Sequence, residues 1–347
     1  MNERIGSTVI ENVRPQLDAG RWPVKRVEGE SLTVKADIFK EGHDVLVAVV
    51  RWRQVAPKEQ ATEWAEVPMV AKGNDLWEAD FPLTRNGRYE FTVEAWPDLF
   101  ATWVTEIKRK VDVGRDVKSE LLEGAAMLRG HAERAQKAGG ADEAKRFLEA
   151  AARFEKGMSP DAIAMAMDPG LTLAASKHAD RALAIRYDRV LEVFVDRDKA
   201  RYGSWYEFFP RSVLRDGRTH GTFRDAEKWL PYVQSLGFDV IYLPPIHPIG
   251  RTARKGKNNS LTAGPEDVGS PWAIGATEGG HKAVHPALGT LEDFKRFVQA
   301  ANGLGIEIAL DIAFQCSPDH PYVKEHPEWF QQRPDGTIKT AENPPKR

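Results

Sequence analysis

The spacing of apolar and polar positions predicts an all-β region at the start of the chain. Apolar and polar residues alternate in short runs, for example at 31–39 and 89–96, and glycine or asparagine separates several of these runs. Alternation with a period of two predicts strands with one buried face, and many short strands in succession are typical of a sandwich. We therefore expect an immunoglobulin-like β-sandwich, formed by residues 1–115 together with residues 185–200.

The apolar period becomes helical between residues 116 and 184. Leu121, Ala125 and Leu128 recur at intervals of four and three residues, and this spacing places them on one face of a helix. Strand-like composition returns at 189–195. We therefore predict that residues 116–184 form a helical insert in the sandwich domain.

From Tyr202 onward, predicted strands and helices alternate strictly. The elements, in order, are a strand at 202–209, a helix from Thr222 or Asp225 to Leu236, a strand at 239–243, a helix from Thr290 to Leu304 and a strand at 306–313. This order is typical of the start of a parallel (β/α)8 TIM barrel, which carries its chemistry at the carboxyl ends of its strands. Asp311 stands at the end of the third strand, so we look for the function within residues 201–347.

Two segments of this region resemble the α-amylase superfamily of glycoside hydrolases and transglycosylases. They are HPALGTLEDF at 285–294 and GIEIALD at 305–311. In that superfamily, such segments form the second helix and the third strand of the catalytic barrel. The resemblance therefore implies the same fold for this part of the chain.

Five further segments narrow the resemblance to the bacterial α-1,4-glucan:maltose-1-phosphate maltosyltransferases. They are WYEFFPRS at 205–212, RKGKNN at 254–259, GSPWAIG at 269–275, QCSPDHP at 315–321 and ENPPK at 342–346. Most amylases carry Asn-His where this chain has Gln315-Cys316, whereas the maltosyltransferases carry the same Gln-Cys pair. Enzymes of this family move a maltosyl unit from maltose 1-phosphate to the non-reducing end of an α-1,4-glucan and release phosphate.

The resemblance assigns roles to residues that spacing alone would leave as surface groups. Lys255 matches a lysine that contacts the donor sugar, and Asn259 lies in the same loop. Gln315 matches a glutamine that binds the donor near the scissile bond. An ammonium group donates to several hydroxyls, and an amide both donates and accepts, so both suit a sugar.

Three other residues receive roles from the same resemblance. Asn343 and Lys346 match residues that line the phosphate position, where hydrogen-bond donors and positive charge suit a leaving group that gains negative charge. Asp311 matches an aspartate that orders the floor of the active site. The resemblance thus implies structural support, and not acid catalysis, for Asp311.

The resemblance also implies a retaining double displacement by two carboxylates that follow the fourth and fifth barrel strands. Residues 201–347 are too few for a complete barrel, which takes about 250 residues. We therefore expect a barrel truncated after its third strand, in the N-terminal part of a longer protein. We expect no catalytic residue within this chain and no activity from it alone.

Charge balance and residue usage limit the partners and the compartment. The chain has 49 basic and 51 acidic residues and a formal net charge of −2, which gives no electrostatic case for nucleic acid or an acidic membrane. Cys316 is the only cysteine, so no internal disulfide is possible. The sequence has no signal-peptide core at its start and no apolar run of about 20 residues. We therefore expect a cytoplasmic protein.

His281, His285 and His320 could be taken as metal ligands together with Asp319, but no two of the histidines have the compact spacing of metal ligands. We expect ordinary hydrogen-bonding roles for them, no metal and no cofactor. The partners that the resemblance implies are maltose 1-phosphate and α-1,4-glucan or maltooligosaccharides. It also implies a homodimer, to which the sandwich and the helical insert contribute.

Two other functions stay open at this point. One is an α-amylase-type glycoside hydrolase, because selectivity for glucan over water is not visible in these residues. The other is a non-catalytic glucan-binding or dimerising module, in which Trp52, Trp64, Trp77, Trp96 and Trp103 would stack on sugar rings. Because Trp52 shares strand parity with apolar positions, we expect it and most of the others to belong to the core.

Overall fold

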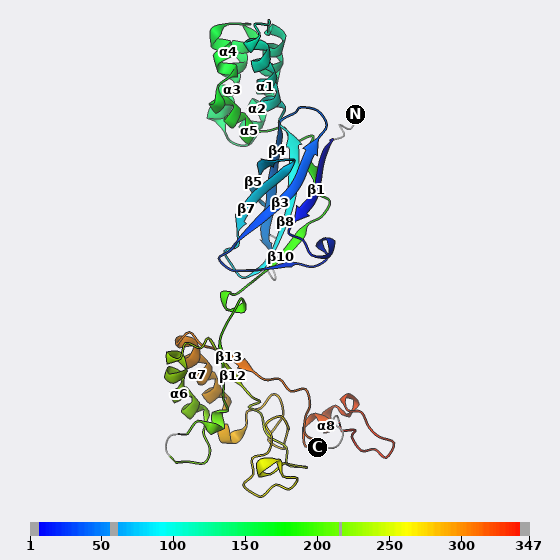
Figure 1. Ribbon diagram of the computed structural model, residues 1–347, viewed down its shortest axis with the longest axis vertical. Helices are drawn as coiled ribbons and strands as arrows, with labels where there is room; N and C mark the ends of the chain where they lie inside the picture. Colours follow the sequence, from blue (N-terminus) through cyan, green and yellow to red (C-terminus); the bar gives the residue numbers. More distant parts are fainter. Residues whose placement is uncertain (1–6, 56–61, 215–216, 341–347) are drawn as a thin grey trace. The chain divides into compact units, whose positions relative to one another are not determined.

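The computed structural model describes residues 7–55, 62–214 and 217–340. The chain divides into two compact units, Met1–Ala200 and Arg201–Arg347 (Figure 1). The first unit contains two β-sheets and a group of helices, and the second contains a parallel sheet of three strands with helices. Among the described residues, no helix is both long enough and apolar enough to cross a membrane.

The two sheets of the first unit pack on each other through a shared apolar core. One sheet has the order β1-β3-β7-β6, and the other has the order β2-β10-β8-β4-β5, with β9 paired to β8. The strands are β1 (Thr8–Arg14), β2 (Val24–Val27), β3 (Ser31–Lys40), β4 (Leu46–Val55), β5 (Ala65–Pro68), β6 (Val70–Gly73), β7 (Leu76–Pro82), β8 (Gly87–Pro97), β9 (Ile185–Arg186) and β10 (Leu191–Asp196). Leu32 and Phe81 from the first sheet share one core with Val50 and Phe91 from the second. The alternation in the sequence accounts for this, because every second side chain of a strand points to the same face.

The helices lie between β8 and β9 in the sequence, and they begin earlier than predicted. They are α1 (Leu99–Asp112), α2 (Lys118–Lys137), α3 (Ala141–Glu155), α4 (Pro160–Ala166) and α5 (Pro169–Lys177). The prediction that the first sandwich segment extends to residue 115 is therefore wrong for residues 99–112. Asp98 caps α1 by accepting a hydrogen bond from the N–H of Ala101 at 2.9 Å. Phe100 and Trp103 then bury one face of the helix, although their residue types favour strands.

Helices α1 and α2 approach closely at Gly124. A Cβ atom at this position would lie 2.2 Å from Cζ2 of Trp103, so only glycine leaves room for the indole. The indole Nε1–H donates to the carbonyl oxygen of Glu120 at 2.7 Å. The five helices enclose a core of their own, distinct from the core between the sheets.

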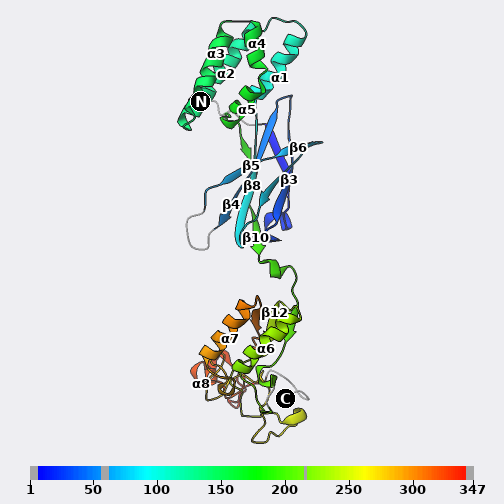
Figure 2. The same ribbon diagram turned by 90° about the vertical axis from the view of Figure 1, so that its left-hand side faces the viewer.

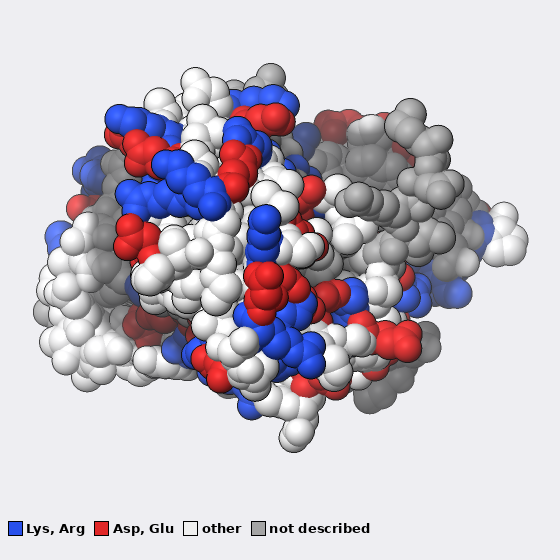
Figure 3. Space-filling model, turned by 90° about the horizontal axis from the view of Figure 1, so that it is seen from above, with Lys and Arg blue, Asp and Glu red and all other residues white. Residues whose placement is uncertain are grey.

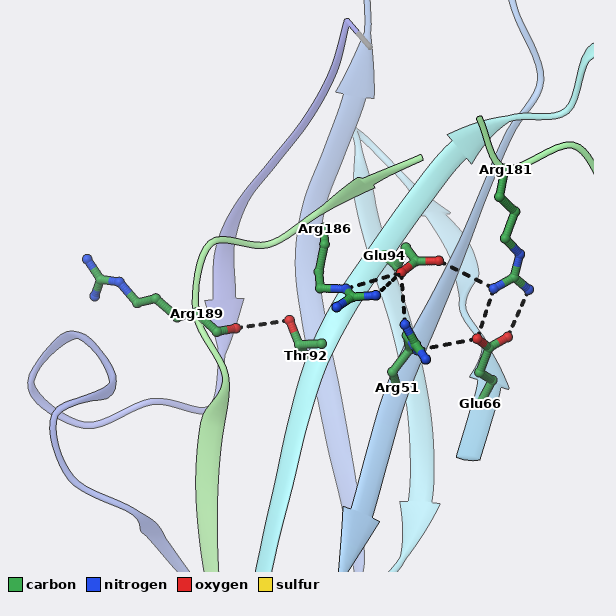
Figure 4. A network of polar contacts seen from close by, with 7 residues as sticks. All are labelled: Arg51, Glu66, Thr92, Glu94, Arg181, Arg186 and Arg189. Carbon is green, nitrogen blue, oxygen red and sulfur yellow. Dashed lines mark hydrogen bonds and ion pairs between the residues drawn. The ribbon is translucent and has the colours of Figure 1, made fainter. Parts of the chain in front are cut away.

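A network of ion pairs fixes the return of the chain from α5 to the second sheet (Figure 4). Glu94 on β8 is 7% exposed. Its carboxylate accepts hydrogen bonds from Arg51, Arg181 and Arg186 at 3.2, 3.3 and 3.0 Å. Arg181 also binds Glu66 through two hydrogen bonds of 2.8 Å. Because Arg181 and Arg186 follow α5, these contacts hold the chain against the sheet where it re-enters the sandwich.

The second unit has the strand and helix order predicted for the start of a barrel. Its elements are β11 (Trp205–Glu207), α6 (Phe223–Ser235), β12 (Val240–Leu243), α7 (Leu291–Gly303), β13 (Glu307–Leu310) and α8 (Tyr322–Glu325). The sheet order is β11-β12-β13, and α6 and α7 lie side by side (Figure 2). The first strand is shorter than the predicted 202–209, because Tyr202 is 76% exposed while Phe208 turns into the core ahead of Pro210.

The two helices beside this sheet begin at capping boxes. Thr222 is the N-cap of α6, and its hydroxyl and backbone N–H pair with the backbone and side chain of Asp225. Thr222 and Asp225, the two alternative starts predicted for this helix, thus take part in one cap. Thr290 and Asp293 form the same motif at α7. The capped helices then pack through an aromatic core with ring centroids 5.3 to 6.3 Å apart.

Candidate functional site

The three parallel strands end at a common edge, and Asp311 is held there by side chains from other segments. Asp311 follows β13 directly, and its Oδ2 accepts a hydrogen bond from the Nε1–H of Trp272 at 2.7 Å. Burial, together with a hydrogen bond to Asp311, raises the pKa of the Tyr242 hydroxyl on β12. Phe209, which follows β11, meets the Trp272 ring edge-on at 6.1 Å. Residues at the ends of all three strands thus surround one carboxylate and its indole partner.

The loop that carries Lys255 and Asn259 is built around the side chain of Arg254. The guanidinium of Arg254 donates three hydrogen bonds of 2.9 to 3.1 Å to backbone carbonyl oxygens of the same loop region. Lys255 and Asn259 line one cavity of about 330 Å³. The loop therefore brings these two predicted donor-site residues together.

A strand-like segment through Ile274 connects this loop with the loop that carries Gln315. Ile274 forms a β-bridge with Ile249 on one side and with Cys316 on the other. Ile249 precedes the Lys255 loop, and Cys316 is the neighbour of Gln315. The two loops therefore flank a common segment.

Asp319 attaches the second loop to the first through backbone contacts. Its Oδ2 accepts hydrogen bonds from the N–H groups of Arg251 and Thr252 at 2.6 and 2.7 Å, and its Oδ1 accepts one from the Thr252 hydroxyl at 2.6 Å. Burial opposes ionisation, but these hydrogen bonds lower the pKa of Asp319 overall. Gln315 is exposed and is not among the described residues that line the cavity at Lys255. That Lys255 and Gln315 face one cavity thus stays a prediction.

The three histidines that were considered as metal ligands form hydrogen bonds, as expected for them. The rings of His281 and His320 are hydrogen-bonded to each other, with 3.0 Å between Nδ1 of His281 and Nε2 of His320. His285 accepts a hydrogen bond from the N–H of Ala287 at 3.2 Å and caps a short 3₁₀ turn. Burial lowers the pKa of His285 to about 4, so this ring is neutral near pH 7. Within the part of the chain that the structure describes, no three His, Cys, Asp or Glu side chains are grouped so as to hold a metal ion.

The structure does not describe the residues that are predicted to line the phosphate position. Asn343 and Lys346 lie outside the described residues. Of the six residues singled out from the sequence, the structure therefore describes Lys255, Asn259, Gln315 and Asp311.

Three residues have contacts at this edge that the sequence did not predict. Trp272 and Tyr242 contact Asp311, and Asp319 joins the two loops. Trp272 stands in a segment that resembles the maltosyltransferases, but 39 positions separate it from Asp311. No hydrophobic period or motif spacing in the sequence connects these pairs.

The five tryptophans considered for sugar stacking contact other groups of the protein. Trp52 and Trp77 pack against the sandwich core, and Trp103 belongs to the core of the helices. Trp64 and Trp96 lie beneath arginine guanidinium groups, 4.5 and 4.1 Å from the ring centres. The expectation of a core role is confirmed for Trp52, and these contacts do not favour sugar stacking.

Basic and acidic side chains are mixed over the face of the protein drawn in Figure 3. Ion pairs of the helical segment include Arg129 with Glu155 at 2.7 Å and Arg146 with Asp168 at 2.8 Å. That face carries no extended area of one sign, in keeping with the net charge of −2.

Comparison with known proteins gives three kinds of match, to family models, to solved structures and to curated proteins. A family model for domain N/S of α-1,4-glucan:maltose-1-phosphate maltosyltransferase matches residues 6–197. A family model for the catalytic domain of α-amylase matches residues 207–342. Among solved structures, an α-amylase from Lactobacillus plantarum is 34% identical over 41% of this chain and 29% of that chain, with a TM-score of 0.34.

Curated relatives match along the whole chain. The α-1,4-glucan:maltose-1-phosphate maltosyltransferase of Myxococcus xanthus is 72% identical over 347 residues, which are 100% of this chain and 52% of that protein. The protein of the same name from Chlorobaculum tepidum is 50% identical over 98% of this chain and 49% of that protein. The chain spans about half the length of the curated relatives it matches. The chain belongs to the α-1,4-glucan:maltose-1-phosphate maltosyltransferase family.

Proposed function

We propose that the protein containing this chain transfers a maltosyl unit from maltose 1-phosphate to the non-reducing end of an α-1,4-glucan and releases phosphate. The observation that carries the proposal is the 72% identity to the Myxococcus xanthus maltosyltransferase over the entire chain. The neighbouring loops at the carboxyl ends of β12 and β13 supply a place for the donor, since barrel enzymes build their sites at this face.

Within this reaction, the chain provides one side of the donor site. Lys255 and Asn259 donate hydrogen bonds to sugar hydroxyls from the cavity that they share. Gln315 binds the donor near the scissile bond, where its amide both donates and accepts. The β-bridges of Ile274 to both loops and the bonds of Asp319 across them support this assignment, because they keep the two loops adjacent.

Asp311 acts in this proposal as a support and not as an acid. Its carboxylate accepts a hydrogen bond from Trp272 and contacts Tyr242, which fixes its orientation. The reaction is a retaining double displacement by two carboxylates, and none of the residues assigned a role here supplies either of them. Asn343 and Lys346 stabilise the phosphate as negative charge develops on it.

The proposal extends to the fold of the sandwich and to the oligomeric state of the protein. The order β1-β3-β7-β6 opposite β2-β10-β8-β4-β5 supports an immunoglobulin-like fold. In this assignment β1-β3-β7-β6 are strands A-B-E-D, β10-β8-β4 are strands G-F-C, and the helices are inserted between F and G. A groove of about 750 Å³ on the helices is lined by Ile163, Met167 and Leu173, and Leu173 is 66% exposed. This apolar groove supports a homodimer, which sedimentation velocity would test.

The test of the transfer reaction uses a complete protein that contains residues 1–347. It is incubated with maltose 1-phosphate, with and without maltohexaose. Transfer predicts phosphate release that depends on the acceptor, and products longer by two glucose units. An amylase-type hydrolase would instead produce new reducing ends from glucan without the donor. Glucan binding without any turnover would favour a non-catalytic module and overturn the proposal.

A further inference from the structure

A chain of hydrogen bonds through two imidazole rings ends at the loop that carries Gln315. The backbone N–H of Tyr322 donates to Nδ1 of His320 at 3.0 Å. Nε2 of His320 lies 3.0 Å from Nδ1 of His281, and Nε2 of His281 lies 2.7 Å from the carbonyl oxygen of Ala313. Ala313 is two positions before Gln315. The rings therefore connect α8 to the donor-site loop.

The two ends of this chain determine where each ring carries its proton. A backbone N–H only donates and a carbonyl oxygen only accepts. His320 accepts at Nδ1, so its neutral ring carries the proton at Nε2 and donates it to His281. His281 accepts at Nδ1 and donates from Nε2 to Ala313. All four ring nitrogens are used and every bond runs in the same direction, which fits two neutral imidazoles.

An added proton has no acceptor in this arrangement. On Nδ1 of His320 it would face the N–H of Tyr322. On Nδ1 of His281 it would face the Nε2–H of His320 across 3.0 Å. In either case two donors oppose each other in place of a hydrogen bond, which is unfavourable. The bonded chain is therefore compatible only with the neutral form of both rings.

The site of His320 leaves the ring no room to turn away. His320 is 1% exposed. A Cβ atom at Gly275 would lie 2.5 Å from the Cβ of His320, and one at Gly280 would lie 2.0 Å from its Nε2. Backbone thus encloses the ring on two sides, so relief of a clash requires movement of a loop.

Other titratable groups surround the pair. The ring of His247 lies 5.6 Å from that of His281. Charged groups that line the adjoining cavity with His320 are Arg251, Asp319, Lys324 and Glu325. Burial, together with His281 and His247, lowers the pKa of His320, while Glu325 raises it. His320 is therefore neutral at pH 7 and takes up a proton below its ordinary value of 6.5.

We propose that His281 and His320 are positioning residues for Gln315. Their neutral forms hold residues 313–315 in place, and the proton that His320 takes up in mildly acidic solution releases this segment. The proposal rests on the proposed function, in which Gln315 binds maltose 1-phosphate. Binding of the donor then weakens as the pH falls, although neither histidine contacts the donor.

The thiol of Cys316 reports on this segment directly. Cys316 is the only cysteine of the chain and is the neighbour of Gln315. We compare its rate of reaction with 4,4′-dithiodipyridine in the folded chain and in the chain unfolded in guanidinium chloride. Burial raises the pKa of the folded thiol, so below pH 7.5 the thiolate fraction falls with pH by the same factor in both states. The ratio of the two rates therefore changes with pH only if the segment opens.

We expect the ratio of the folded rate to the unfolded rate to be constant from pH 7.5 to 6.5 and to rise about tenfold by pH 5. This rise corresponds to the loss of one of the hydrogen bonds between Tyr322 and Ala313. The double variant His281→Gln/His320→Gln has no titratable ring in the series of hydrogen bonds from Tyr322 to Ala313, so its ratio of rates should not change with pH. His326→Gln is the matched control, because His326 is 40% exposed and lies outside the bonded chain. It should keep the wild-type profile. A constant ratio in the wild type, or a rise that persists in the double variant, would overturn the proposal.

A second measurement decides the matter if the double variant does not fold. Long-range ¹H–¹⁵N NMR spectra of the wild-type chain should show both rings neutral at pH 7.5, with the proton at Nε2. Protonation of His320 should coincide with the rise in Cys316 reactivity. A proton at Nδ1 of either ring would contradict the proposed chain of bonds.

The consequence for the donor is tested in the complete protein. KM for maltose 1-phosphate should rise over the same pH interval while kcat changes less. The donor phosphate itself takes up a proton with a pKa of about 6, so the double variant should keep only this contribution and show a smaller rise than the wild type. A complete protein that does not use maltose 1-phosphate would remove the proposed function. It would leave the positioning role to be judged by the thiol ratio and the NMR spectra, which need no donor.

Discussion

The indole of Trp272 donates a hydrogen bond to the carboxylate of Asp311 at 2.7 Å, although 39 positions separate the two residues. The bond joins the long loop after β12 to the end of β13. Phe209 meets the edge of the same indole. The Asp311 carboxylate, held in this way, has one orientation. A residue that orders the floor of an active site requires such a fixed orientation.

Replacing Trp272 by Phe tests the importance of this hydrogen bond. Trp272→Phe keeps a six-membered aromatic ring and removes the N–H donor together with the pyrrole ring. We expect a loss of about 1 kcal/mol in the free energy of unfolding, because the bond to the charged group is partly exposed. In the complete protein, kcat/KM for maltose 1-phosphate should fall on the order of tenfold. Trp329→Phe is the control, since Trp329 is 61% exposed, and an equal loss in both variants would contradict the role of the bond.

Substitution of the donor-site residues should affect use of the donor more than the fold. We expect Lys255→Ala and Gln315→Ala each to raise KM for maltose 1-phosphate up to about tenfold in the complete protein, because each removes hydrogen bonds to the sugar. Lys295→Ala is the matched control, because Lys295 lies on α7 and pairs with Glu292 at 2.9 Å. Wild-type catalytic efficiency in both variants would remove the donor-site assignment.

Local signals in the sequence predicted the second unit well. The helix starts at Thr222 and Thr290 were visible because a capping residue and an acid three positions later stand close together in the chain. The start of α1 was missed because Phe100 and Trp103 belong to residue types that favour strands. The cap from Asp98 and the burial of one helical face override that preference.

The contacts that organise the candidate site had no local signal. Asp319 bonds to Thr252 across 67 positions, and His281 bonds to His320 across 39 positions. These residues come together only because the loops after β12 and β13 meet at the edge of the sheet. Hydrophobic period reports which face of an element is buried, and it carries no information on which loop residues become neighbours.

The network around Glu94 should contribute measurably to the stability of the first unit. Glu94→Gln keeps the size of the side chain and removes the charge that three arginines share. We expect a loss of about 1–3 kcal/mol in the free energy of unfolding by urea, because Glu94 is buried while its partners are partly exposed. Glu192→Gln is the control, because its pair with Arg88 is exposed and contributes about 0–1 kcal/mol. Equal losses in the two variants would show that the network adds nothing.

The cap of α6 predicts a stability difference that depends on pH. Hydrogen bonds from Arg218 and Thr222 hold the pKa of Asp225 well below its ordinary value of 3.8. A lowered pKa in the folded state stabilises the fold above pH 3.8 and loses this effect as the pH falls toward the folded value. Asp225→Asn should therefore destabilise the chain by about 1 kcal/mol at pH 7, and by less at pH 3. Urea unfolding at both pH values is the measurement, and a constant difference would contradict the linkage.

The 347-residue chain by itself should release no phosphate from maltose 1-phosphate. Retaining transfer needs a nucleophilic carboxylate and a second one as acid and base, and loss of such groups typically lowers the rate by many orders of magnitude. We do not expect Asp311 to replace them, because its carboxylate accepts a hydrogen bond from Trp272 and contacts Tyr242. The chain is incubated with maltose 1-phosphate and a maltooligosaccharide, and phosphate is assayed beside the complete protein as a positive control. Release clearly above that of a sample without protein would show that the catalytic groups lie within these residues, with Asp311 as the first candidate to re-examine.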